Sequence, residues 1–308
     1  MKLKIKKLLG LALATAMMMS VAACSSVSVD GEKDSGTETK EGNGSIGLSV
    51  STLNNPFFVT LTEGAKEKAK EKNVDLIVVD AGDDAAKQTS DIEDLISKNI
   101  SVLIVNPVDS DAVAPVVKDA IEKGIKVVSV DRIVNGVDVD SAIASDNVAG
   151  AKLAAEYLLS LVGEGSKVAE LEGVPGASAT IDRGKGFHEI ADTKLNVVSK
   201  QTANFNRSEG MTVMENMLQA NSDIVAVFAH NDEMALGALE AINGKDIVVV
   251  GFDATDDALA AVKEGKMAAT VAQQPELMGS TAVETAVKLI AGETVEKSIP
   301  VEVTLVKE

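Results

Sequence analysis

The sequence predicts an α/β protein built from two doubly wound parallel sheets. Short runs rich in valine and isoleucine alternate with longer amphipathic runs over about 260 residues. The runs at 76–79, 102–105 and 247–250 are continuously apolar, as expected of strands that helices cover on both faces. The length of the alternating region favours two such sheets over one.

Each element has an expected range. The strands are predicted, in chain order, at 46–50, 75–79, 102–105, 126–130, 141–144, 167–171, 195–200, 224–229, 247–251, 268–272 and 301–306. The helices between them are predicted at about 56–72, 85–98, 111–124, 146–162, 177–191, 207–220, 232–243, 255–264 and 276–291. Five glycines fall where helix ends favour left-handed backbone: Gly124, Gly163, Gly244, Gly265 and Gly292.

The first 23 residues predict a targeting segment. Four lysines precede an apolar run of roughly 16 residues, which is short for a membrane span and typical of a signal peptide. The run ends in Val-Ala-Ala-Cys, which looks like a bacterial lipobox, so we expect Cys24 to carry a lipid. An ordinary signal peptide with an unrelated cysteine is the alternative. The polar residues 24–44 predict a flexible tether. We expect the lipid to anchor the protein to the outer face of the cytoplasmic membrane.

Charge and cysteine content exclude several classes of protein. The net charge is −18, and loss of the leader's four lysines takes it to −22. A chain this acidic repels nucleic acid and anionic membrane surfaces. Cys24 is the only cysteine in the sequence, so no disulfide can form within the chain.

The sequence motifs of common enzymes and cofactor sites are absent. There is no glycine pattern for a dinucleotide or a phosphate loop, and no Gly-x-Ser-x-Gly. The two histidines lack metal-ligand spacing; we expect His188 on the surface and His230 in a structural role. The sequence therefore predicts no catalysis, no metal and no cofactor.

The segment 51–58, Ser-Thr-Leu-Asn-Asn-Pro-Phe-Phe, is the most informative loop. It holds two of the six phenylalanines in a chain with one tyrosine and no tryptophan. One interpretation is structural: Asn54 or Asn55 caps the next helix, Pro56 begins it, and both rings enter the core. The other is that Phe57 and Phe58 form an apolar wall for a ligand to which Asn55 donates a hydrogen bond.

Polar side chains follow most of the predicted strands, at the sheet edge where open α/β folds bind ligands. Helix capping or a structural role explains Asp80, Asp109, Asp146 and Asp232. Capping explains Arg132 and Phe205 poorly, and Asp131 and Asp253 only partly. Carboxylates, guanidinium groups, amides and phenyl faces together suit a neutral sugar, whose hydroxyls donate and accept while its C–H faces are apolar.

Several segments resemble the D-ribose-binding proteins of bacterial ABC importers, which are sugar-binding periplasmic binding proteins of type I. They are Ser-Thr-Leu-Asn-Asn-Pro-Phe-Phe at 51–58, Asn-Pro-Val-Asp-Ser-Asp-Ala-Val at 106–113, Val-Asp-Arg at 130–132, Ile-Ala-Ser-Asp-Asn at 143–147, Asn-Asp-Glu-Met-Ala-Leu-Gly-Ala at 231–238 and Val-Gly-Phe-Asp at 250–253. The resemblance implies ten ligand-binding residues: Asn55, Phe57, Phe58, Asp131, Arg132, Arg183, Phe205, Asn231, Asp253 and Gln273. The chain departs from the family pattern beside the site, with Ala254 where glycine is common and Gln274 where an apolar residue is common.

The resemblance also implies an architecture and partners. A first lobe at 45–145 plus 274–301 and a second at 146–273 plus 302–308 would be joined by three crossovers and close over ribose. Phe57 and Phe58 would stack on one face of the sugar and Phe205 on the other. A monomer would deliver the sugar to an ABC permease and its ATPase subunit. The alternative ligands are another sugar, such as allose or xylose, and autoinducer-2. The alternative functions are a purely sensory protein and a surface enzyme.

Overall fold

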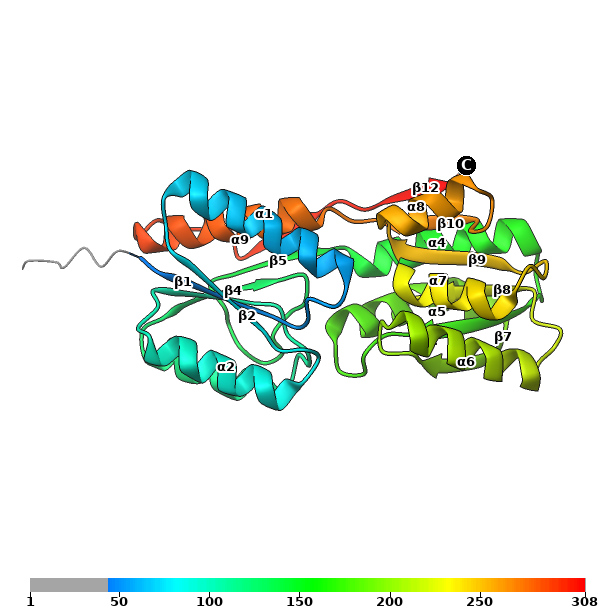
Figure 1. Ribbon diagram of the computed structural model, residues 1–308, viewed down its shortest axis with the longest axis horizontal. Helices are drawn as coiled ribbons and strands as arrows, with labels where there is room; N and C mark the ends of the chain where they lie inside the picture. Colours follow the sequence, from blue (N-terminus) through cyan, green and yellow to red (C-terminus); the bar gives the residue numbers. More distant parts are fainter. Residues whose placement is uncertain (1–43, 308) are drawn as a thin grey trace, which may run out of the picture. The chain divides into compact units, whose positions relative to one another are not determined.

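The computed structural model describes residues 44–307 (Figure 1). The predicted leader, Cys24 and nearly all of the tether lie outside the described residues. Within this range, no helix combines the length and the apolar character that crossing a membrane requires.

The first sheet has six parallel strands in the order β11-β5-β4-β3-β1-β2. Their bounds are β1 Ile46–Val50, β2 Leu76–Asp80, β3 Val102–Val105, β4 Lys126–Val130, β5 Ser141–Ser145 and β11 Ser298–Val301. Leu48 in β1 pairs with Val78 on one side and Ile104 on the other. Such continuously apolar strands at the centre of the sheet confirm the prediction of coverage on both faces.

The second sheet also has six strands, in the order β12-β10-β9-β8-β6-β7. Their bounds are β6 Lys167–Glu172, β7 Asn196–Thr202, β8 Ala226–Ala229, β9 Val248–Asp253, β10 Ala269–Ala272 and β12 Thr304–Lys307. The strands pair in parallel except β12, which runs antiparallel to β10 at the edge.

Helices cover both faces of each sheet, which confirms the predicted doubly wound α/β class. Their bounds are α1 Pro56–Lys72, α2 Ala85–Ser97, α3 Ala114–Glu122, α4 Asn147–Val162, α5 Ser178–Lys194, α6 Arg207–Ala220, α7 Asp232–Ile242, α8 Asp256–Lys263 and α9 Pro275–Ile290. In the first sheet, α1 and α9 share one apolar core while α2 and α3 share the other. In the second sheet, the two cores contain residues of α4 and α5, and of α6, α7 and α8. We call each sheet with its helices a lobe.

Helices α1 and α9 lie side by side on the first sheet (Figure 1). Two glycines allow this close approach. A Cβ at Gly64 would lie 2.3 Å from the carbonyl oxygen of Glu276, and one at Gly279 would lie 1.9 Å from that of Leu61. Only glycine permits such backbone contact. This packing fixes α1, whose first turn carries Phe57 and Phe58.

The chain passes between the two sheets three times: after β5, after β10 and after β11. The third passage corrects the prediction of one strand at 301–306. Residues 298–301 instead form β11 in the first sheet and residues 304–307 form β12 in the second, with residues 302–303 between them. Apolar pattern alone does not show where a chain leaves one sheet for another, because both strands bury the same residue types.

Candidate ligand site between the lobes

One cavity between the lobes, which we call the central cavity, is nearly filled by the side chains around it and leaves a volume of about 10 Å³. Both lobes contribute to its wall. All ten residues that the sequence singled out line it, together with Ala179: Asn55, Phe57, Phe58, Asp131, Arg132, Arg183, Phe205, Asn231, Asp253 and Gln273. The structure therefore gathers residues that are up to about 220 positions apart in the sequence into one site.

The loop before α1 serves the fold and lines the cavity at the same time. Asn55 is the N-cap of α1, and its Oδ1 accepts a hydrogen bond from the backbone N–H of Phe57 at 3.0 Å. Pro56 is the first helical residue. The cap uses Oδ1 alone, so it does not engage the nitrogen Nδ2 of Asn55. The two interpretations of this loop therefore do not exclude each other, because they use different atoms of Asn55.

The rings of Phe57 and Phe58 lie perpendicular to each other, with centroids 5.2 Å apart. Both rings are nearly buried and belong to the first lobe's core as well as to the cavity wall. Perpendicular rings cannot both lie parallel to one flat face of a ligand. In this arrangement one ring can present its face to a ligand, and the other its edge.

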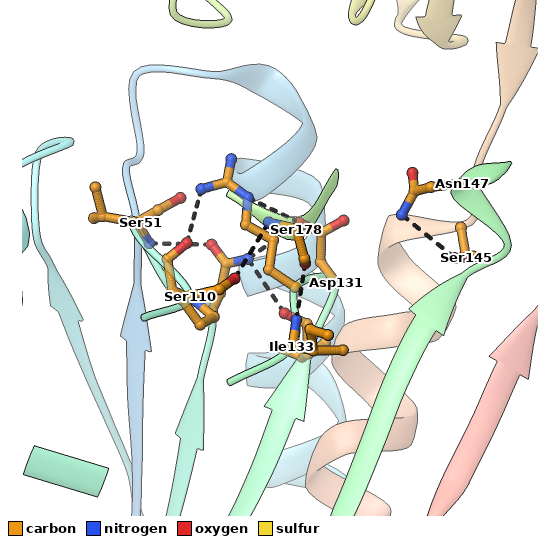
Figure 2. Close-up of polar contacts among 12 residues, drawn as sticks. Ser51, Ser110, Asp131, Ile133, Ser145, Asn147 and Ser178 are labelled. Atoms are coloured by element: carbon orange, nitrogen blue, oxygen red, sulfur yellow. Dashed lines mark hydrogen bonds and ion pairs between the residues drawn. The ribbon is translucent and has the colours of Figure 1, made fainter. Parts of the chain in front are cut away.

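A buried asparagine orients the loops that carry Asp131 and Asn55. Asn106 follows β3, and its Nδ2 donates to Oδ2 of Asp131 at 3.1 Å and to the carbonyl of Val130 at 3.2 Å. Its Oδ1 accepts from the backbone N–H of Ser51 at 3.1 Å, so one side chain joins the ends of two strands. Its partners Ser51 and Asp131 are labelled in Figure 2. The sequence alone does not predict a role for Asn106. Its one signal was an amide directly after a buried strand.

Arg132 places a cation between aromatic rings of the two lobes. Its guanidinium carbon lies 5.1 Å from the ring centroid of Phe58 and 5.3 Å from that of Phe205. Its Nη1 donates to the carbonyl oxygen of Pro107 at 2.8 Å, and its Nε lies 3.6 Å from Oδ2 of Asp131. That Nε is buried and has no hydrogen-bond partner within residues 44–307.

Arg183 is the corresponding cation of the second lobe. It extends from α5, with Nε donating to Oδ1 of Asn147 at 2.8 Å and Nη1 donating to the carbonyl oxygen of His230. Its guanidinium carbon lies 3.8 Å from the ring centroid of Phe252, and Nη1 lies 3.7 Å from Oδ1 of Asp253. Asn147 is a second positioning residue that the sequence analysis missed.

The remaining polar residues of the second lobe hold one another in place. Asn231 caps α7 through Oδ1, which accepts from the N–H of Met234 at 3.0 Å, while its Nδ2 donates to the carbonyl of Phe205 at 3.3 Å. Gln273 donates from Nε2 to Oδ1 of Asp253 at 2.7 Å. The Oε1 of Gln273 is buried and has no partner in the described chain.

Comparison with known proteins agrees with this arrangement of two lobes around a cavity. Residues 46–294 match the family described as periplasmic binding protein domain. The chain belongs to this family. Over 256 residues it is 57% identical to the ribose import binding protein RbsB of Bacillus subtilis, covering 82% of this chain and 84% of that protein. It is 45% identical to RbsB of Haemophilus influenzae over 96% of this chain and 98% of that one.

Solved structures show the same fold. An ABC transporter solute binding protein from Bacillus halodurans with bound myo-inositol superposes with a TM-score of 0.83 at 35% identity. The match covers 87% of this chain and 96% of that one. The chain is therefore a periplasmic binding protein in both sequence and fold.

Four of the nine non-glycine residues with positive φ among residues 44–307 lie at or beside the central cavity of this periplasmic binding protein. Asp131, Phe205 and Asp253 have φ angles of 64°, 58° and 127°, and Ala254 beside the cavity has 58°. Such conformations are costly for residues other than glycine and persist where surrounding contacts impose them. The ring of Phe205 packs against Gly173 so closely that a Cβ at Gly173 would lie 2.0 Å from the ring.

The charges of the site balance. Burial raises the pKa of the Asp131 and Asp253 carboxyls above their usual range, and the nearby arginines Arg132 and Arg183 oppose that rise. Burial likewise lowers the pKa of both arginines, and the two carboxylates oppose that fall. Two acids and two bases leave no net charge for a ligand to neutralise, so the cavity suits a neutral polar molecule.

The structural roles predicted for four aspartates are confirmed. Asp109 and Asp146 accept hydrogen bonds from backbone N–H groups at the start of the segments they precede, and Asp80 accepts from Leu53 and Gly82. Asp232 is fully buried and accepts from Thr255 and Thr270.

The two histidines share one buried carboxylate. His230 is buried and pairs with Glu170, as its predicted structural role requires. His188 is less exposed than predicted, because it packs between Glu170 and Asp192. No cluster of potential metal ligands occurs among residues 44–307.

Proposed function

We propose that this periplasmic binding protein captures D-ribose in the central cavity and delivers it to the permease of an ABC importer, without catalysing a reaction. The observation that carries the proposal is the gathering of all ten predicted residues around one cavity. Identity to relatives supports the choice of ribose. It reaches 57% and 45% with two proteins named for ribose import, against 35% with the protein that holds myo-inositol.

Each polar group of the cavity has a role in this proposal. Asp131 and Asp253 accept hydrogen bonds from sugar hydroxyls, and Arg132 and Arg183 donate to them. Nδ2 of Asn55, Nδ2 of Asn231 and Oε1 of Gln273 complete the set. Because charged hydrogen bonds in a dry site are strong, a sugar that lacks one hydroxyl would leave a charged partner unpaired, at a cost of about 1–3 kcal/mol.

The aromatic rings enclose the apolar faces of the sugar. One of Phe57 and Phe58 presents its face on the first lobe, and Phe205 lies on the opposite side. The guanidinium of Arg132 already contacts rings from both lobes, which supports a ligand held between them.

The lobes move as units in this proposal, with bounds of 45–145 plus 274–301 and 146–273 plus 302–308. The three passages between the sheets form the hinge, and closure buries the sugar. A lipid on Cys24 anchors the chain to the outer face of the cytoplasmic membrane. The permease lies in this membrane, and the tether lets the folded part reach it, while the ATPase subunit couples release of the sugar to ATP hydrolysis.

Calorimetric titration of the purified protein tests the ligand. D-ribose is compared with D-allose, D-xylose, L-arabinose, myo-inositol and autoinducer-2 under one set of conditions. We expect saturable 1:1 binding of D-ribose at least tenfold tighter than that of any other compound. No binding of ribose, or tighter binding of another sugar, would refute the ribose assignment.

Separate tests address transport and catalysis. Incubation with ribose, ribose 5-phosphate and a nucleoside, followed by chromatography, should return each compound unchanged. Loss of ribose uptake in cells that lack the gene, restored by the full-length gene, would support transport. A purely sensory role predicts normal uptake in the same cells.

A further inference from the structure

The helix that carries Arg183 lacks an N-cap from its own lobe. The first N–H groups of a helix have no partner within the helix, and a Ser, Thr, Asp or Asn at the N-cap position usually accepts from one of them. At the start of α5 that position holds Ala177, whose side chain can accept no hydrogen bond.

The missing acceptor comes from the other lobe. Oγ of Ser110, in the loop after β3, accepts from the backbone N–H of Ser178, the first residue of α5, at 3.2 Å. The backbone N–H of Ser110 donates to the carbonyl of Gly176 at 3.1 Å. Ser110 is fully buried, and its own carbonyl accepts from Asn135 of its own lobe at 2.8 Å. Figure 2 shows Ser110 beside Ser178.

A second loop of the first lobe takes part. Oγ of Ser178 accepts from the backbone N–H of Ile133 at 3.1 Å, and Ile133 directly follows Arg132 (Figure 2). The lobes also meet closely at Gly176, where a Cβ would lie 2.1 Å from Oδ2 of Asp109. The start of α5 thus touches the first lobe at two separate loops, beside the arginines of both lobes.

We propose that Ser110 is a positioning residue for the ligand site, because it caps α5 from the opposite lobe when the lobes close. The cap forms only when the lobes meet, so it adds stability to the closed state alone. It also fixes the first turns of α5, and with them Arg183, without touching the sugar. The proposal rests on ribose capture as the function.

Ribose release separates this role from a merely structural one. For Ser110→Ala we expect dissociation of radiolabelled D-ribose to be three- to tenfold faster, with an association rate within twofold of the wild-type rate. The melting temperature of the ribose-free protein stays within about 1 °C of the wild-type value, because the lost cap changes its free energy of unfolding little, while that of the ribose complex falls. Ser178→Ala, which removes the acceptor for Ile133, should change the same quantities in the same direction.

Two variants serve as controls. Ser110→Thr keeps the hydroxyl and should restore slow release. Asp84→Ala removes a cap within one lobe, since Asp84 accepts from Ala86 and Lys87 at the start of α2. Asp84→Ala should lower the melting temperatures of the ribose-free protein and of the ribose complex equally, and leave the rate of ribose release unchanged.

The proposal is overturned if Ser110→Ala releases ribose within twofold of the wild-type rate. It is also overturned if Ser110→Ala behaves as Asp84→Ala does. A wild-type protein that binds no ribose refutes the proposed function alone. The cap is then tested by hydrogen exchange of the Ser178 amide in the complex with whichever other sugar of the calorimetric panel binds: faster exchange in Ser110→Ala than in the wild type supports it, and unchanged exchange overturns it.

Discussion

Arg183 donates a hydrogen bond from Nε to Oδ1 of Asn147 at 2.8 Å. Asn147 is the first residue of α4, two positions after β5, so it lies where the chain first leaves the first sheet. A buried cation of the ligand site is therefore held by the connection between the lobes. The guanidinium needs this partner, because burial disfavours its charge.

Asn147→Ala should weaken ribose binding by about 1–3 kcal/mol, because it leaves a buried guanidinium N–H without an acceptor. Calorimetry at 25 °C measures the change. Asn221→Ala, at the end of α6, is the matched control and should bind as the wild type does. Combined with Arg183→Ala, the Asn147 substitution should add little further loss. Additive losses would show that Asn147 does not act through Arg183.

Arg183→Ala should weaken ribose binding by at least ~2 kcal/mol, because it removes charged hydrogen bonds from a site closed to water. Calorimetric titration measures this loss as well. Arg207→Ala is the control in the same lobe. Arg207 pairs with Glu233 and Asp257 at a partly exposed position, so its loss should alter stability more than affinity. Unchanged affinity in Arg183→Ala would remove this residue from the site.

The sequence predicts the strands well because they leave local signals, whereas the full set of cavity-wall residues is implied by the family resemblance. Continuous apolar runs mark the buried strands, and residues such as Phe57 and Arg132 are chemically out of place for a loop. It does not predict that Ser110 caps α5, since the two partners are 68 positions apart and a single serine has no periodic pattern. The division of 301–306 between two sheets has no local signal either.

Ala254→Gly should stabilise the protein by about 0.5–1 kcal/mol. Ala254 has φ = 58°, where a Cβ costs about 1–2 kcal/mol, and the added freedom of glycine in the unfolded chain offsets part of this gain. Urea unfolding measures the change. Ala260→Gly, at an exposed position inside α8, is the control and should destabilise by about 1 kcal/mol. If both variants lose stability equally, the strain at Ala254 is not real.

Asp232 should make stability fall as pH rises from about 4 to about 7. Burial raises the pKa of this carboxyl to about 7, although hydrogen bonds from Thr270 and Thr255 oppose the rise. Because the pKa is raised in the folded state, the native protein keeps a proton in this window that the unfolded chain has lost. The contribution of Asp232 to stability is therefore constant below about pH 4, declines up to about pH 7, and is constant again above it.

Asp232→Asn removes this titration while leaving an oxygen to accept from Thr255. The free energy of unfolding of the variant, relative to the wild type, should rise between pH 4 and 8 by on the order of 2–4 kcal/mol. Urea unfolding at several pH values measures it. Ala260→Gly changes no titratable group, so its difference from the wild type should stay constant over the same range. A constant or shrinking difference for Asp232→Asn would mean that Asp232 is ionised in the folded protein at pH 4 and above.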